Sequence, residues 1–169
     1  MLSGRKTRIR PLELEDLDSL YLWYSDPEFT YWLSGNWPEK SLLRRDEIER
    51  RFFDEDPFRY ALLDEAGALI GVIGFDELNI PARSVRLFLG IGEKAYWGKG
   101  YGTDALRCFT DHLFGHWNFH RLSLETWDGN KRALACYAKA GFQQEGVLKD
   151  AYYIDGRYRD GILLALVRS

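Results

Sequence analysis

The sequence lacks most features that mark secreted, membrane-spanning or nucleic-acid-binding proteins. Its two cysteines, Cys108 and Cys136, are too few for a disulfide framework and lack the CxxC spacing of a zinc site. The longest aliphatic run, Ile162 to Val167, is far shorter than the roughly 20 residues of a membrane span. A net charge of -3 with scattered basic residues argues against nucleic acid as the main partner. We therefore expect no metal, no membrane, no nucleic acid and a cytoplasmic location.

What the sequence does contain is enough apolar material for one packed domain over residues 1–169, with 46% hydrophobic and 15% aromatic residues. Apolar periodicity and turn signals predict about seven strands and about four helices. The predicted strands are Thr7–Leu12, Phe58–Leu63, Leu69–Leu78, Val85–Ile91, Arg121–Thr126, Gly146–Ile154 and Tyr158–Val167. The predicted helices are Leu14–Tyr21, about Glu39–Phe53, Tyr101–Phe114 and Asn130–Ala140.

The connections between these elements indicate the fold class. Short turns make the strands between Phe58 and Ile91 an antiparallel meander, and Asp155-Gly156 is a strong hairpin signal. Gly141 stands at the usual position just past a helix end. The order β-α-α-β-β-β-α-β-α-β-β predicts a three-layer α/β domain with a mixed, mostly antiparallel, twisted sheet between helices.

Glycines alternate at Gly98, Gly100 and Gly102, between a predicted strand and a predicted helix. Without β-carbons, backbone N–H groups in such a turn can converge on an anion at the positive end of the helix, and Lys99 can add charge. The chain contains no P-loop string GxxxxGK followed by Ser or Thr. The dinucleotide fingerprint GxGxxG fails because its sixth position is Thr103. The loop therefore predicts a phosphate-binding turn of unspecified kind, although a glycine-rich turn without a ligand stays an alternative.

Three groups of residues, in order along the chain, resemble motifs of the GNAT acetyltransferase superfamily. The first is Gly90-Ile91-Gly92 followed by Trp97 to Leu106, and the second is Asn130 to Ala133 with Tyr137 and Lys139 to Phe142. The third, Glu145-Gly146 through Asp155-Gly156-Arg157 to Asp160, is similar to the branch that holds ribosomal-protein N-terminal and spermidine acetyltransferases. The resemblance implies a GNAT-like fold and acetyl-CoA as the acetyl donor.

The same resemblance implies a set of cofactor-binding residues: Gly90, Ile91, Gly92, Trp97, Gly98, Lys99, Gly100, Tyr101, Gly102, Thr103, Asn130 and Ala133. Trp97 stands where the family usually has Arg or Gln. The contact expected there is largely from the backbone, so we expect the change to remove a polar side chain and to leave binding intact. Asn130 also opens a predicted helix, and a helix cap is its alternative role.

The resemblance assigns catalytic roles as well. Acetyl transfer needs a neutral amine, a donor for the oxyanion and a proton for the leaving thiolate. Tyr137 matches the tyrosine that the family uses as general acid toward sulfur, with a core tyrosine as the alternative. Glu125 resembles the general base of some ribosomal-protein acetyltransferases, with an ordinary solvated glutamate as the alternative, and Glu93 is the second candidate base. Cys136 adjoins Tyr137, but adjacent helix positions point about 100° apart, so we expect only one of them to face the site.

An aromatic stretch without regular periodicity precedes the meander: Tyr21, Trp23, Tyr24, Phe29, Tyr31, Trp32 and Trp37. By resemblance it forms one wall of the acceptor site, where rings can hold an amine, and we single out Phe29 and Trp32, with Asp26 adding negative charge. The predicted function is acetyl transfer to a primary amine, with a peptide or protein N-terminus favoured over a polyamine or small amine. A non-catalytic acyl-CoA sensor is the alternative, and the resemblance leaves a homodimer open.

Overall fold

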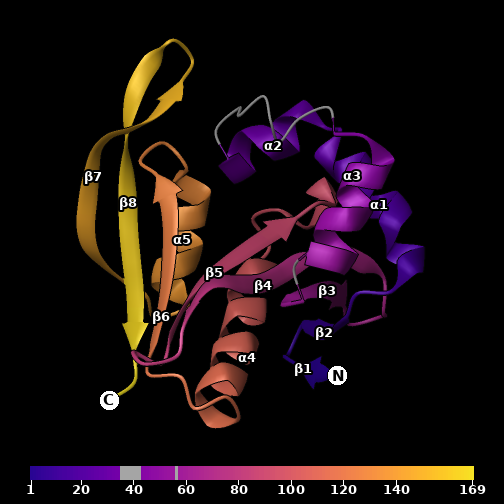
Figure 1. Cartoon of the computed structure of the whole chain (residues 1–169), viewed down its shortest axis with the longest axis horizontal. Coiled ribbons are helices and arrows are strands. Elements are labelled where there is room, and N and C mark those ends of the chain that lie inside the picture. The colour runs from indigo at the N-terminus through magenta and orange to yellow at the C-terminus, as the bar shows by residue number, and fades with distance from the viewer. Residues whose placement is uncertain (35–42, 56) are drawn as a thin grey trace.

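The computed structural model describes residues 1–34, 43–55 and 57–169, and these residues form an open eight-stranded sheet flanked by helices (Figure 1). The strand order is β1-β2-β3-β4-β5-β6-β8-β7. The strands are β1 (Leu2–Ser3), β2 (Thr7–Pro11), β3 (Arg59–Asp64), β4 (Leu69–Asn79), β5 (Ser84–Ile91), β6 (Arg121–Trp127), β7 (Gln143–Ile154) and β8 (Arg157–Val167). The sequence predicted about seven strands, and it missed β1, because two residues are too short for alternation to mark.

The described residues contain five α-helices, which cover both faces of the sheet. They are α1 (Leu17–Tyr24), α2 (Pro27–Ser34), α3 (Arg45–Glu49), α4 (Tyr101–Gly115) and α5 (Lys131–Lys139). Buried side chains of α1, α2 and α3 form one core cluster with Val72 of β4. Those of α4 and α5 form a second cluster with strands β2 to β6 and β8. The three-layer α/β class that the sequence predicted is confirmed.

Helix α2 was not expected, because Asp26-Pro27 resembles a turn signal. The same dipeptide also starts a helix: Pro27 occupies the first helical position, where its missing N–H costs nothing. The Asp26 carboxylate accepts from the backbone N–H of Glu28 at 3.0 Å, as an N-terminal cap does. The expectation that this stretch is irregular is therefore wrong for residues 27–34.

The second predicted helix, about Glu39–Phe53, is only partly described. Its described portion is α3, which continues as a π-helix, Arg50–Glu55, with Phe52 buried. Residues 39–42 lie outside the described part of the chain, as does Trp37.

Two local predictions are confirmed in detail. Asp155 and Gly156 both have positive φ, 54° and 75°, as the hairpin turn between β7 and β8 requires. Gly141 has φ 102° just past α5.

The sheet opens between β5 and β6, and this opening positions the candidate site. The two strands are parallel and paired only over Ser84–Arg86 and Arg121–Ser123. Beyond that short ladder they diverge (Figure 1), while β6 stays paired with β8 along its whole length. Both strands therefore turn an unpaired edge toward the space between them.

Candidate active site

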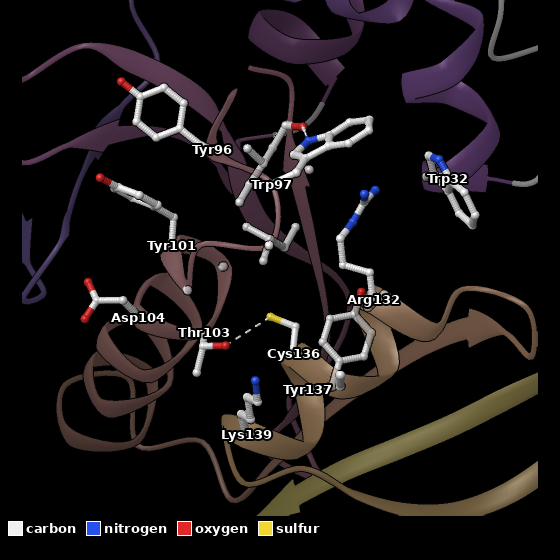
Figure 2. Close-up of a pocket in the computed structure, with 18 of the residues that line it drawn as sticks. Trp32, Tyr96, Trp97, Tyr101, Thr103, Asp104, Arg132, Cys136, Tyr137 and Lys139 are labelled. Carbon is white, nitrogen blue, oxygen red and sulfur yellow. Dashed lines mark hydrogen bonds between the residues drawn. The ribbon is translucent and has the colours of Figure 1, made fainter. Parts of the chain in front are cut away.

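A cavity of about 590 Å³ runs from the opening between β5 and β6 along α5 to the first turn of α4 (Figure 2). Most of the residues singled out from sequence line it: Phe29, Trp32, Gly90, Ile91, Trp97, Gly98, Gly100, Tyr101, Gly102, Thr103, Glu125, Asn130, Ala133 and Tyr137. Within the described ranges, Asp26, Gly92, Glu93 and Lys99 are outside its wall. The fold thus brings residues of α2, β5, β6, α4 and α5 around one space.

The glycine loop has the backbone geometry that an anion-binding turn requires. Gly98 and Gly100 have φ of 70° and 86°, in the left-handed region that glycine adopts without strain. Gly100 is the N-cap of α4, so the N–H groups of the first turn have no partner within the helix. The loop therefore fits a pyrophosphate at the positive end of α4.

Strand β5 presents alternate backbone groups to the cavity. The Gly92 N–H donates to the Ile70 carbonyl at 2.9 Å, so Gly90 and Gly92 direct their backbone groups toward β4. Leu89 and Ile91 direct theirs toward the opening, where the ladder with β6 has ended. The Ile91 carbonyl accepts from the Trp97 indole N–H at 2.7 Å. The Ile91 N–H and both backbone groups of Leu89 then suit an amide-containing arm such as pantetheine.

Gly90 and Gly92 have a steric role. A β-carbon on Gly90 would lie 3.1 Å from Cζ of Phe29, and one on Gly92 would lie 1.9 Å from Cδ2 of Trp23. These two glycines therefore allow α1 and α2 to close onto β5.

Tyr137 lies on α5, with its ring in the cavity wall and only 7% of its surface exposed. Burial raises the pKa of its phenol well above the ordinary value, so the group keeps its proton. Cys136 lines the same cavity, which contradicts the expectation that only one of the two faces the site. Both do because the cavity follows α5: the Thr103 hydroxyl donates to the Cys136 sulfur at 3.6 Å near the loop (Figure 2). Burial raises the pKa of that thiol, which does not favour a nucleophile.

Asn130 uses its side chain within the protein. Its Oδ1 accepts from the Ala133 N–H at 3.4 Å and caps α5. Its Nδ2 donates to the Trp32 carbonyl at 3.0 Å and to the Thr126 hydroxyl at 3.2 Å. Asn130 therefore ties α2, β6 and α5 together beside the cavity, and a cofactor contact stays a prediction.

Each oxygen of the Glu125 carboxylate contacts a neighbouring side chain. The Tyr152 hydroxyl donates to Oε1 at 2.9 Å, and the Arg86 guanidinium lies 3.3 Å from Oε2. Tyr152 belongs to β7, and its ring passes over β8 at Gly161, where a β-carbon would lie 3.2 Å from the ring. Glu93, the other candidate base, accepts from the Trp23 indole N–H at 2.9 Å.

The end of the cavity where the sequence predicts the acceptor is lined by aromatic rings. Trp32 stacks on Trp127 with centroids 5.7 Å apart and planes 9° apart. The Arg132 guanidinium lies 4.0 Å from the ring centroid of Trp97 and 5.5 Å from that of Trp32. Asp26 does not reach the cavity wall.

Sequence reasoning missed Arg86, Tyr152 and Arg132. No local sequence pattern identifies Arg86 or Tyr152 as a partner of Glu125. They meet it only because the order of strands places β5 and β7 on either side of β6 and β8. Arg132 lies two residues after Asn130, inside the second motif of the family resemblance. Its contact with the Trp32 ring could have been suspected, because an arginine near exposed aromatic rings often packs against one.

The described residues contain no group of three His, Cys, Asp or Glu placed to hold a metal ion. None of their helices is long and apolar enough to cross a membrane.

Comparison with known proteins agrees with the geometry. A family model described as an acetyltransferase (GNAT) domain matches residues 6–143. Spermidine N(1)-acetyltransferase of Escherichia coli is 27% identical over 98% of this chain and 88% of its own length. The ribosomal protein uS5-alanine N-acetyltransferase of the same organism is 34% identical over 64% of this chain and 57% of its own.

A solved structure of spermidine N-acetyltransferase from Vibrio cholerae in complex with CoA and spermine has the same fold. It aligns over 95% of both chains with a TM-score of 0.81 and 23% identity. The family match covers the glycine loop, the unpaired edge of β5 and all of α5. The chain belongs to the GNAT acetyltransferase family and is an acetyl-CoA-dependent N-acetyltransferase.

Proposed function

We propose that the chain acetylates the N-terminal amine of a peptide or protein, in a ternary complex with acetyl-CoA. The observation that carries this proposal is the charge of the cavity wall. Among the described lining residues, the carboxylates are Glu125 and Asp104, and Asp104 lies beyond the glycine loop. A single carboxylate at the acceptor end suits a single ammonium group, whereas a polyamine carries several.

The acidic residues at the start of α2, Asp26 just before it and Glu28 in its first turn, do not change this balance. The Lys94 ammonium lies 2.7 Å from the Asp26 carboxylate and 2.6 Å from that of Glu28, and these contacts raise the pKa of Lys94. Arg132 adds a positive charge to the wall. A polycationic acceptor would meet one carboxylate and a guanidinium there, which is unfavourable for its second and third charges.

In the proposed mechanism, two residues that line the cavity, Glu125 and Tyr137, exchange protons with the reacting atoms. Bound acetyl-CoA supplies the thioester carbonyl. The acceptor nitrogen, once neutral, forms the new N–C bond as the C–S bond breaks, and Glu125 takes the proton that nitrogen releases, directly or through a water. Tyr137 holds a proton for the departing sulfur, because its buried phenol stays protonated.

Arg86 and Tyr152 act on Glu125 in this scheme. A hydrogen bond from Tyr152 to one oxygen and an ion pair with Arg86 at the other fix the direction of the carboxylate, and a fixed base needs less reorganisation at the moment of proton transfer. Burial and the Glu125 charge raise the pKa of Tyr152, so its hydroxyl remains a donor at neutral pH. We propose both as positioning residues.

The test is a thiol-release assay on an acceptor panel. It contains peptides with a free N-terminus, the same peptides with a blocked N-terminus and one lysine, and spermidine. We expect kcat/KM to be highest for free N-termini and lower for spermidine. A higher kcat/KM for spermidine would contradict the proposal and favour the polyamine reading. Absence of turnover with every amine, together with retained acetyl-CoA binding, would favour the sensor alternative.

A further inference from the structure

The cavity continues past the glycine loop, and its outer end is basic. Arg5, Arg107 and Lys139 line it there, from the N-terminal segment, α4 and α5 respectively. We call these three residues the outer cation cluster. Figure 2 shows Lys139 beside Thr103, on the side of the cavity away from Trp32. The basic end of the cavity therefore lies away from the aromatic end that contains Trp32.

Asp104 is the carboxylate at this end, but its oxygens are occupied by backbone and hydroxyl donors. They accept from the N–H groups of Arg5, Lys6 and Thr7 at 3.1, 2.9 and 3.0 Å, and from the Thr7 hydroxyl at 2.7 Å. These bonds fasten residues 5–7 to the first turn of α4. Asp104 thus fixes the position of Arg5 through its backbone and leaves the guanidinium free.

The cluster keeps most of its hydrogen-bonding capacity. Arg107 donates from Nη2 to the Lys139 carbonyl at 2.6 Å, and an arginine has five N–H donors. Over residues 1–34, 43–55 and 57–169, none of Arg5, Arg107 and Lys139 forms an ion pair. Three cations without carboxylate partners around one hollow form a potential anion site.

Lys6 is placed differently from the cluster. Its ammonium donates to the Lys99 carbonyl at 2.9 Å and lies 5.2 Å from the Tyr101 ring centroid. It therefore sits over the glycine loop, where the pyrophosphate fits, and adds charge there.

We propose that the outer cation cluster binds the 3′-phosphate monoester of coenzyme A and makes the enzyme distinguish CoA from dephospho-CoA. The thioester end of the ligand belongs at Tyr137, and the loop fits the pyrophosphate. The nucleotide must then occupy the remaining end of the cavity. A phosphate monoester carries about -1.5 to -2 charge at pH 7 and three acceptor oxygens, which match the free donors of two arginines and a lysine.

The experiment measures binding of CoA and of dephospho-CoA, which lacks only the 3′-phosphate, by calorimetry with the full chain. We expect the wild type to bind CoA about tenfold or more tightly than dephospho-CoA. Arg5→Met, Arg107→Met and Lys139→Met should each lower that ratio about threefold, as exposed charge pairs do. The affinity for dephospho-CoA should stay within about twofold of the wild type, and the ratio should shrink as salt is added.

Two variants serve as controls. Lys149→Met removes an exposed cation of β7 that lies outside the cavity wall in the described residues, and it should leave the ratio unchanged. Lys6→Met should weaken both ligands by the same factor, because it acts at the loop. The proposal is overturned if the wild type binds both ligands equally. It is also overturned if the cluster variants weaken both ligands alike, which would place these cations on the pyrophosphate.

Discussion

The two ends of the cavity present different kinds of groups. We call the end at the glycine loop the donor end and the end at Trp32 and Glu125 the acceptor end. At the donor end, the groups that fit the pantetheine arm and the pyrophosphate are backbone groups: the left-handed turn at Gly98 and Gly100 and the unpaired edge of β5. At the acceptor end the groups are side chains: rings on α2 and a carboxylate held by Tyr152. A backbone site depends on local conformation and survives many substitutions, whereas a side-chain site depends on each residue. Changes at the two ends should therefore separate cofactor affinity from turnover.

The largest effect should follow Tyr137→Phe. Losing a general acid should lower kcat about 10²- to 10³-fold, while acetyl-CoA affinity stays within about twofold. Because burial raises the pKa of this phenol, its protonated, active form persists as pH rises, and wild-type kcat should not decline up to pH about 10. Tyr158→Phe, an exposed tyrosine, is the matched control, and an unchanged kcat in Tyr137→Phe would remove this residue from the mechanism.

Glu125→Gln should have the next largest effect. The amide keeps the shape of the side chain and cannot take a proton, so kcat should fall about 100-fold at neutral pH with little change in acetyl-CoA affinity. Glu145→Gln makes the same change in a carboxylate that pairs with Arg121 outside the cavity wall. This control should leave kcat and acetyl-CoA affinity unchanged. If Glu93→Gln slows the reaction and Glu125→Gln does not, the base is Glu93.

At the donor end, Gly100→Ala should show the opposite pattern. Holding alanine at φ 86° costs about 1–2 kcal/mol, so acetyl-CoA affinity should fall about tenfold, with kcat at saturation nearly unchanged. Gly67→Ala imposes similar strain, φ 91°, on a turn between β3 and β4, and should leave acetyl-CoA affinity intact. A fall in kcat at saturation for Gly100→Ala would mean that the loop also affects chemistry.

Tyr152→Phe tests whether turnover depends on the orientation of the Glu125 carboxylate, to which the Tyr152 hydroxyl donates. Loss of one hydrogen bond to a charged group should lower kcat about tenfold, with unchanged melting temperature and acetyl-CoA affinity. In a Glu125→Gln background the same change should add nothing, because the base is already absent. An additive effect would show that Tyr152 acts independently of Glu125, and Tyr153→Phe, at an exposed neighbour, is the control.

The smallest effect concerns the attachment of the N-terminal segment to α4. Burial raises the pKa of Asp104, but donors from Lys6, Thr7 and Arg5 lower it by more, and the net shift is downward. The charged carboxylate therefore stabilises the fold above about pH 3.9, and this contribution is lost as pH falls through the folded-state pKa. Asp104→Asn should lower the melting temperature by a few degrees at pH 7, and the difference from wild type should disappear in acid. Asp111→Asn on the same helix should behave as wild type.

Much of the donor end was predictable because its signals are local. The glycines mark the turn, the amphipathic run after them marks α4, and Asn130 caps α5 through its own neighbours. The acceptor end was predicted only in outline. The stretch after Asp26-Pro27 was expected to be irregular, but it forms helix α2. The dipeptide is compatible with both a turn and a helix start, and the packing of Phe29 in the core favours the helix.

The sequence by itself determined the class of fold, the glycine turn before α4 and the hairpin at Asp155-Gly156, because φ preference and apolar periodicity act within a few residues. Only the tertiary structure decided which groups meet. Tyr152 reaches Glu125 across β8, and Asp104 binds a segment 97 to 99 residues earlier in the chain. Such pairs form because the order of strands in the sheet, and the packing of α4 beside β1 and β2, bring them together. No local preference encodes that arrangement.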